Sequence, residues 1–260
     1  MATVADVLNY IETLAPRYMK EDWDNVGLLC GRKDNEVRKI LVALDPFRSV
    51  IDEAIAEKAD LIVTHHPLVF REPLMAVNED TETGRCVLTL IEHGIAAINA
   101  HTNLDMAPGG INDVLAATLG LQDTEIINPV GEPPYGLLRC GTVAQQPLDD
   151  FLAVVKYALK CDGLRYVDSG KPVHKVAVGG GSCADGMFEA VEAGCDTFVT
   201  ADIKYNQFRT AHDLGLNLID AGHFHTENPT MPVLTKKLQA AFPEIEVKFS
   251  QKHTDCMKFY

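Results

Sequence analysis

The segment Leu61-Ile62-Val63-Thr64-His65-His66-Pro67 is the part of the sequence from which the fold is best derived. Four residues with β-strand character lead into two adjacent histidines, and a proline then prevents the strand from continuing. Because successive side chains of a strand point to opposite faces, the two imidazoles point in different directions. Such a pair can serve two neighbouring metal ions, or one ion and a substrate. It can equally be the half-exposed end of an ordinary strand.

Similar strands lie on both sides of this segment, separated from it by stretches with helical periodicity. The sequence predicts strands at residues 39–45, 60–64 and 95–100, and helices at residues 4–14, 50–58, 83–93 and 111–119. Strands that alternate with helices of this length indicate parallel βαβ units. We therefore expect an α/β protein with mixed, mostly parallel sheets.

An internal repeat begins after residues 128–137, which are rich in proline and glycine. Lys175-Val176-Ala177-Val178 resembles Lys39-Ile40-Leu41-Val42 (175 against 39, an offset of 136 residues), and Val199-Thr200 matches Val63-Thr64 at the same offset. We expect two intertwined α/β units that arose by duplication, one from residues 1–128 and 229–260 and the other from residues 129–228. Functional groups at the strand ends would then gather in the cleft between the units.

Each half of the repeat also contains a histidine followed four residues later by a carboxylate. His101 precedes Asp105 and His223 precedes Glu227, just after the third predicted strand of each half. Together with His65 and His66, these residues suit zinc, iron, manganese or nickel, and the set lacks the thiolates of a structural zinc site. Six such residues exceed the needs of one tetrahedral ion, which favours two neighbouring ions. The alternative is that they are separate polar residues at strand ends.

Three other features allow a functional and a structural interpretation. Trp23, the only tryptophan, can line a pocket or anchor a loop. The glycine-rich turn before Cys183, residues 179–181, can be an anion-binding nest or a compact backbone turn, and Cys183 itself can be a nucleophile. His225 can add a ligand or face solvent. The remaining histidines, which have no partner pattern, are interpreted as surface or cap residues: His93, His174, His212 and His253.

Composition and charge exclude several classes of protein. Of the 260 residues, 47% are hydrophobic and 23% are charged, as in globular proteins. The 37 acidic and 23 basic residues give a net charge of −14, which argues against nucleic acid or an anionic membrane as a partner. The seven scattered cysteines form no C-x-x-C pair and indicate reduced thiols. Without a signal core or a membrane-spanning run, we expect a cytoplasmic protein.

Four motifs lie in order along most of the chain: Trp23-Asp24-Asn25-Val26-Gly27-Leu28, Thr64-His65-His66-Pro67, Asn103-Leu104-Asp105, and Gly222-His223 with Thr226-Glu227. Their combination resembles the Nif-three-like family, whose members are labelled GTP cyclohydrolase I type 2 homologues. The resemblance implies a dinuclear metal centre in the cleft between two intertwined units. It also implies a ring-shaped homohexamer with its sites facing the interior.

The resemblance further implies a role for each candidate residue. Two divalent ions per chain would be held by His65, His66, Asp105, His223 and Glu227. His101 would lie beside them to orient a ligand, to add a ligand or to carry a proton. We expect His101 to act as general acid or base, because an imidazole titrates close to neutral pH.

The function that these expectations favour is metal-dependent hydrolysis, in which bound ions lower the pKa of water toward ~7. The family label points to a nucleotide-like substrate, attacked at C8 of the guanine ring of GTP with release of formate. Two alternatives stay open: a phosphate-ester hydrolase, and a non-catalytic metal-binding protein that regulates or acts as a scaffold. No substrate-binding residue can be assigned from the sequence.

Overall fold

The computed structural model describes residues 1–70 and 74–260, which form two compact units. Unit 1 contains Met1–Leu104 and Met231–Thr254, and unit 2 contains Asp105–Thr230 and Asp255–Tyr260. The chain therefore passes from one unit to the other three times, at residues 104/105, 230/231 and 254/255. Within the described ranges, no helix is both long enough and apolar enough to cross a membrane.

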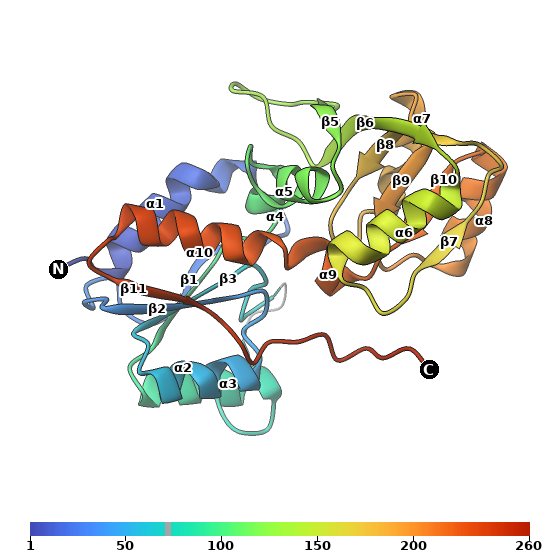
Figure 1. Cartoon of the computed structure of the whole chain (residues 1–260). Helices are drawn as coiled ribbons and strands as arrows, with labels where there is room; N and C mark the ends of the chain where they lie inside the picture. The colour runs from blue at the N-terminus through green and yellow to red at the C-terminus, as the bar shows by residue number, and fades with distance from the viewer. Residues whose placement is uncertain (71–73) are drawn as a thin grey trace. The chain divides into compact units, whose positions relative to one another are not determined.

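Unit 1 is built on a five-stranded mixed sheet (Figure 1). The strand order is β1 (Gly27–Cys30), β4 (Ala96–Asn99), β3 (Leu61–Thr64), β2 (Lys39–Ala43) and β11 (Glu246–Phe249). Only β1 is antiparallel to its neighbour. The register pairs Thr64 with Asn99, so the residues that follow β3 and β4 emerge next to each other at one edge of the sheet.

Helices cover both faces of this sheet, so its central strands are buried throughout. Helices α1 (Val4–Leu14) and α10 (Thr230–Ala241) lie on one face, and α2 (Arg48–Glu57) and α3 (Glu82–Glu92) lie on the other (Figure 1). Alternate residues of one strand serve the two faces; Ile62 packs with α2 and α3, whereas Leu61 and Val63 point the other way. Helix α1 begins with a capping box in which Thr3 and Asp6 exchange hydrogen bonds.

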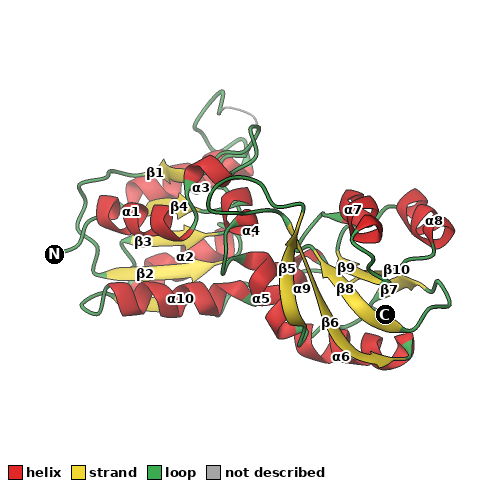
Figure 2. Ribbon diagram, turned by 90° about the horizontal axis from the view of Figure 1, so that it is seen from above, coloured by secondary structure: helices red, strands yellow, loops and turns green. Residues whose placement is uncertain are grey.

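Unit 2 contains a six-stranded mixed sheet (Figure 2). The strand order is β5 (Gln122–Ile127), β6 (Leu138–Gln146), β8 (Val173–Val178), β9 (Thr197–Thr200), β10 (Asn217–Asp220) and β7 (Arg165–Val167). Strands β8, β9 and β10 run parallel, and β6 and β7 join them antiparallel. The parallel pairing again brings the residues that follow neighbouring strands to one edge of the sheet.

Two hydrophobic clusters cover the faces of the second sheet. One joins the sheet to α5 (Ile111–Thr118) and α6 (Leu148–Leu159), with Phe151 fully buried. The other joins it to α7 (Met187–Glu192) and α8 (Tyr205–Leu214) around Phe198. Figure 2 shows α7 and α8 on the side of the sheet opposite to α6. Two short helices, α4 (Thr102–Met106) and α9 (His223–Glu227), follow β4 and β10.

The predicted α/β class is confirmed, with two mixed sheets. The predicted central strands and their helices lie within a few residues of the observed ones; residues 60–64, for example, contain β3. The origin of the two sheets in a duplication stays a prediction. All seven cysteines are free thiols.

Candidate metal-binding residues

Three histidines of unit 1 lie together beyond the ends of two adjacent parallel strands. His65 and His66 follow β3, and His101 follows β4. One ring nitrogen from each lies within 4.8 Å of the others. The ring centroids are separated by 4.9 Å (His65–His66), 5.1 Å (His65–His101) and 5.5 Å (His66–His101). The two adjacent histidines, which the strand pattern predicted to point in different directions, therefore converge with a third. They lie in the bend after β3, where the alternation of side chains along a strand no longer applies.

Each of these histidines is oriented through its Nδ1 atom by an oxygen of unit 1. The partners are the carbonyl of Ala100 for His65 (2.9 Å), the carboxylate of Asp45 for His66 (2.6 Å) and the carboxylate of Asp24 for His101 (2.8 Å). Because these oxygens can only accept, each Nδ1 carries the proton and donates it. The Nε2 atoms are therefore the ones suited to coordinate a metal. Metal-binding histidines in proteins are typically held in this way.

The two orienting carboxylates are kept ionised by their surroundings. Burial raises the pKa of Asp24, but hydrogen bonds from His101 and Thr102 outweigh it and lower the pKa to about 2. Burial likewise opposes ionisation of Asp45, and its contacts with His253 and His66 hold its pKa well below the usual range. Both side chains are therefore acceptors at neutral pH, as the tautomers of the histidines require.

His253 differs from its interpretation as a surface or cap residue. It is buried, its Nε2 atom lies 2.8 Å from Oδ2 of Asp45, and its ring stacks on Phe47. A single carboxylate therefore contacts both His66 and His253. His253 lies four residues after the end of β11, which pairs with β2, and Asp45 lies two residues after the end of β2. The pairing of these two strands explains the contact.

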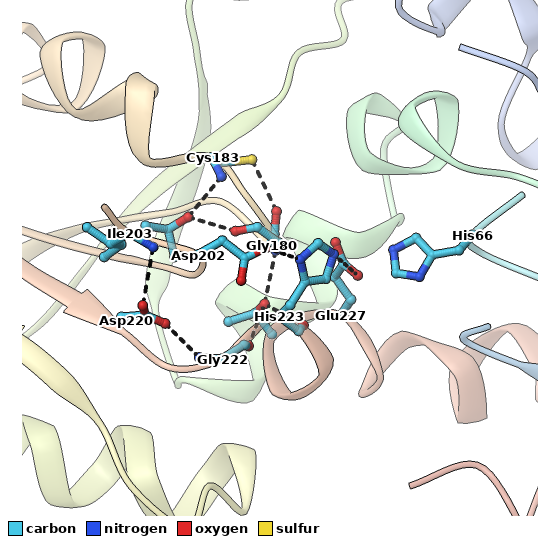
Figure 3. Close-up of polar contacts among 12 residues, drawn as sticks. His66, Gly180, Cys183, Asp202, Ile203, Asp220, Gly222, His223 and Glu227 are labelled. Atoms are coloured by element: carbon cyan, nitrogen blue, oxygen red, sulfur yellow. Dashed lines mark hydrogen bonds and ion pairs between the residues drawn. The ribbon is translucent and has the colours of Figure 1, made fainter. Parts of the chain in front are cut away.

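In unit 2, a second group of candidate ligands lies on and around helix α9. His223 and Glu227 are one helical turn apart, and Nε2 of His223 lies 3.1 Å from Oε2 of Glu227. A carboxylate oxygen of Asp105 lies within 4.8 Å of one of Glu227. Nδ1 of His223 contacts Asp202 at 2.7 Å, so the imidazole lies between two carboxylates (Figure 3). This arrangement repeats the orienting contact found for the three histidines of unit 1.

The two carboxylates make His223 strongly basic. Burial lowers the pKa of His223, but the hydrogen bonds to Asp202 and Glu227 outweigh burial and raise the pKa to about 11. A group of negative oxygens that holds a proton this tightly also favours a bound cation. A divalent ion on Nε2 would take the position of that proton.

The glycine-rich turn after β8 packs closely against His223 and Glu227. Gly181 has φ of +63°, and a Cβ atom there would collide with Oε1 of Glu227 and lie 3.0 Å from Nε2 of His223. The turn's N–H groups donate to protein acceptors: Gly179 to the carbonyl of Val199, Gly180 to Asn112, Gly181 to Thr226 and Cys183 to Thr200. The turn therefore fits a close approach of backbone to carboxylate better than an anion nest.

Cys183 is poorly suited to act as a nucleophile. Burial, together with the nearby charges of Asp105 and Glu227, raises the pKa of its thiol well above the ordinary value. The sulfur donates to the carbonyl of Gly180 at 3.1 Å (Figure 3). His225 contacts the carbonyl of Leu159 through Nδ1 and Asp255 through Nε2, so both of its nitrogens have partners within unit 2.

The orienting carboxylates were absent from the candidate residues derived from the sequence. Asp24 adjoins Trp23, Asp45 follows β2, and Asp202 follows β9. Their position in the sequence could have identified two of them, since Asp45 and Asp202 lie just beyond buried parallel strands, as the histidines do. Imidazole and carboxylate donors, with every imidazole oriented through Nδ1, fit a first-row divalent ion.

Comparison with known proteins gives full-length matches. The family model Duf34/NIF3 (NGG1p interacting factor 3) matches residues 2–256. A Clostridium acetobutylicum protein named GTP cyclohydrolase 1 type 2 homolog is 37% identical over 264 residues, covering 98% of each chain. A Streptomyces coelicolor protein of the same name is 38% identical and covers 88% of this chain and 83% of its own length. The solved structure of a Bacillus cereus protein related to NIF3 matches with a TM-score of 0.94 at 26% identity, covering 100% of this chain and 99% of that chain.

Proposed function

This chain belongs to the Duf34/NIF3 family, and on that premise we propose that it is a metal-dependent hydrolase that acts on a nucleotide-like substrate. The observation that carries the proposal is the shared orientation of four histidines. His65, His66, His101 and His223 each donate from Nδ1 to a carbonyl or carboxylate oxygen, so Nε2 is the atom that would hold a metal.

We further propose that the two groups of ligands together hold two divalent ions per chain. Unit 1 supplies neutral imidazoles, and unit 2 supplies the carboxylates of Asp105 and Glu227 with His223. Imidazoles alone leave the charge of a divalent ion uncompensated, whereas two carboxylates per pair of ions offset part of it. The metal is zinc, iron, manganese or nickel, because this donor set accepts all four.

The chemistry divides between the ions and the chain's own residues. When bound, the ions supply a Lewis acid and a water molecule whose pKa is lowered toward ~7. His101 carries a proton between this water and the leaving group as general acid or base. Asp24 holds its Nδ1–H at 2.8 Å and, because its own pKa is about 2, keeps its charge through the cycle. This pair resembles the histidine–carboxylate pairs of many hydrolases in geometry.

The substrate assignment rests on the relatives. Their name, GTP cyclohydrolase 1 type 2 homolog, supports a reaction at C8 of the guanine ring that consumes two water molecules. The first attacks C8 and breaks one of its two C–N bonds, which opens the ring and leaves a formamide, and the second hydrolyses the formamide to formate and an amine. A phosphate-ester hydrolase would use the same ions on phosphorus instead. A non-catalytic regulatory or scaffold protein would bind the ions and catalyse neither reaction.

The test combines metal content with two product assays. Protein reconstituted separately with Zn²⁺, Mn²⁺, Fe²⁺ and Ni²⁺ is analysed for metal per chain and incubated with GTP, and formate and inorganic phosphate are measured. We expect two ions per chain and formate release. His66→Ala should reduce the release at least ~100-fold, because it removes a ligand.

His212→Ala is the matched control, since His212 is an exposed histidine whose ring contacts Asp213 and not a candidate ligand. It should keep both metal content and activity. Release of phosphate without formate would contradict the cyclohydrolase activity and support the phosphate-ester hydrolase. Full metal occupancy without any product would leave the non-catalytic function.

A further inference from the structure

Two exposed aromatic side chains adjoin the histidine cluster of unit 1. The rings of Trp23 and Phe70 are 5.8 Å apart, and those of Phe70 and His101 are 5.5 Å apart. Trp23 and His101 are separated by 6.2 Å. The interplanar angles are 82°, 81° and 73° respectively, so the three rings stand nearly perpendicular to one another.

Hydrogen bonds of buried and half-buried groups fix the segments that carry these rings. Asn25 donates to the carbonyl of Val69 at 2.7 Å, which ties the residue before Phe70 to the Trp23 segment. Asn99, at the end of β4, donates to the carbonyl of Asn25 at 3.0 Å. Asp24 accepts from both His101 and Thr102. The two segments that carry Trp23 and Phe70 are therefore held at the same end of β4 that positions His101.

Both rings keep a large part of their surface in water. Trp23 is 46% exposed and Phe70 is 43% exposed, although edge-to-face packing and partial burial stabilise each ring. Isolated exposed aromatic residues are common in proteins. Trp23 and Phe70 meet beside candidate metal ligands, on two segments held by polar contacts. Because their planes are 82° apart, a flat ring can stack on the face of one and contact the other edge to face. Any planar heteroaromatic ring offers such a face.

We propose that Trp23 and Phe70 form the platform that binds the planar ring of the substrate and sets its edge beside His101. This inference rests on the proposed function, since it assigns the ring-binding residues of the same site. Stacking recognises the flatness of a ring and not its hydrogen-bonding edge. The platform should therefore accept several nitrogen heterocycles and should not bind a sugar phosphate that lacks one.

The chain provides its own probe, because Trp23 is its only tryptophan. Tryptophan fluorescence of the Zn²⁺-loaded protein is titrated with guanosine 5′-monophosphate and, separately, with ribose 5-phosphate. We expect saturable quenching by the nucleotide and none by the sugar phosphate. Phe70→Leu should weaken the nucleotide's apparent affinity about tenfold, the loss expected when one of two aromatic contacts with the ring is removed.

Phe188→Leu is the matched control, since Phe188 is 53% exposed and lies on α7 of unit 2; it should leave the titration unchanged. Absence of quenching, equal quenching by ribose 5-phosphate, or an unaltered affinity in Phe70→Leu would each overturn the platform. The readout does not depend on turnover. Ring-dependent quenching without hydrolysis would support the aromatic platform and contradict the proposed hydrolase. Hydrolysis without quenching would support the hydrolase and contradict the platform.

Discussion

Asp45 illustrates how a single carboxylate can set the properties of two histidines. It accepts from His66 at 2.6 Å and contacts His253 at 2.8 Å, and both contacts lower its pKa. Because its pKa in the folded protein lies below the ordinary value of 3.8, its contribution to stability is present above that pH. The contribution is lost as acidification passes through the lower, folded value.

Asp45→Asn should weaken metal binding while leaving the fold intact. An amide carries no negative charge, and it can present its oxygen to only one of the two histidines while its NH₂ group faces the other. Either His66 then loses the acceptor that fixes its tautomer, or His253 has to accept a hydrogen bond where it donated one. We expect zinc affinity, measured by competition with a chelator, to fall about 10- to 100-fold. Asp213→Asn removes an exposed carboxylate beside His212 and should not change the affinity. An unaltered affinity in Asp45→Asn would show that the orienting contact is dispensable.

At the scale of elements, the predictable part of the fold was the part buried on both faces. Strands β2 and β3 appear in the sequence as uninterrupted apolar runs because helices cover both sides of them. The antiparallel edge strand β7 has no such run, since two of its three residues, Arg165 and Tyr166, are exposed. Its position depends on pairing with β10, a contact distant in sequence.

The candidate site shows the same division. The adjacent histidines could be selected from sequence because two imidazoles after an apolar strand form a local pattern. The partnership of Asp45 with His253 spans 208 residues and depends on β11 pairing with β2. Likewise, Phe70 is brought to Trp23 by the contact of Asn25 with Val69, which no local pattern encodes. Sequence patterns thus identified candidate ligands, whereas the groups that orient them required the tertiary structure.

The turn between β8 and α7 gives a prediction at this scale. Gly181→Ala adds a methyl group that collides with the Glu227 carboxylate, in addition to the strain of a positive φ. Gly170→Ala is the control, because Gly170 has φ of +77° and open space around its Cβ position. We expect the control to cost about 1 kcal/mol of unfolding free energy, and Gly181→Ala to cost clearly more and to lower metal content. Thermal unfolding and metal analysis measure both; equal effects of the two substitutions would contradict a packing role for the turn.

For the whole molecule, we propose a ring-shaped homohexamer, as the family resemblance implies. The chain has a mass of 28.5 kDa, so six copies would have a mass of about 171 kDa (six times 28.5). Light scattering coupled to size-exclusion chromatography should give this mass at physiological salt. The net charge of −14 per chain makes copies repel one another, so dissociation is expected first at low ionic strength. A mass of one or two chains at all salt concentrations would exclude the ring.

The three crossings between the units also determine the order in which they can be completed during synthesis. Residues 105–230, which carry the whole six-stranded sheet, leave the ribosome before α10 and β11 have been made. The sheet of unit 1, which is begun first, is therefore completed last, because β2 lacks β11, one of its two parallel neighbours, until residue 249 emerges. Domains usually fold in the order in which they are translated. Here the six-stranded sheet of unit 2 can be completed while the sheet of unit 1 still presents an open edge, which makes unit 1 the part of the nascent chain most in need of protection from aggregation.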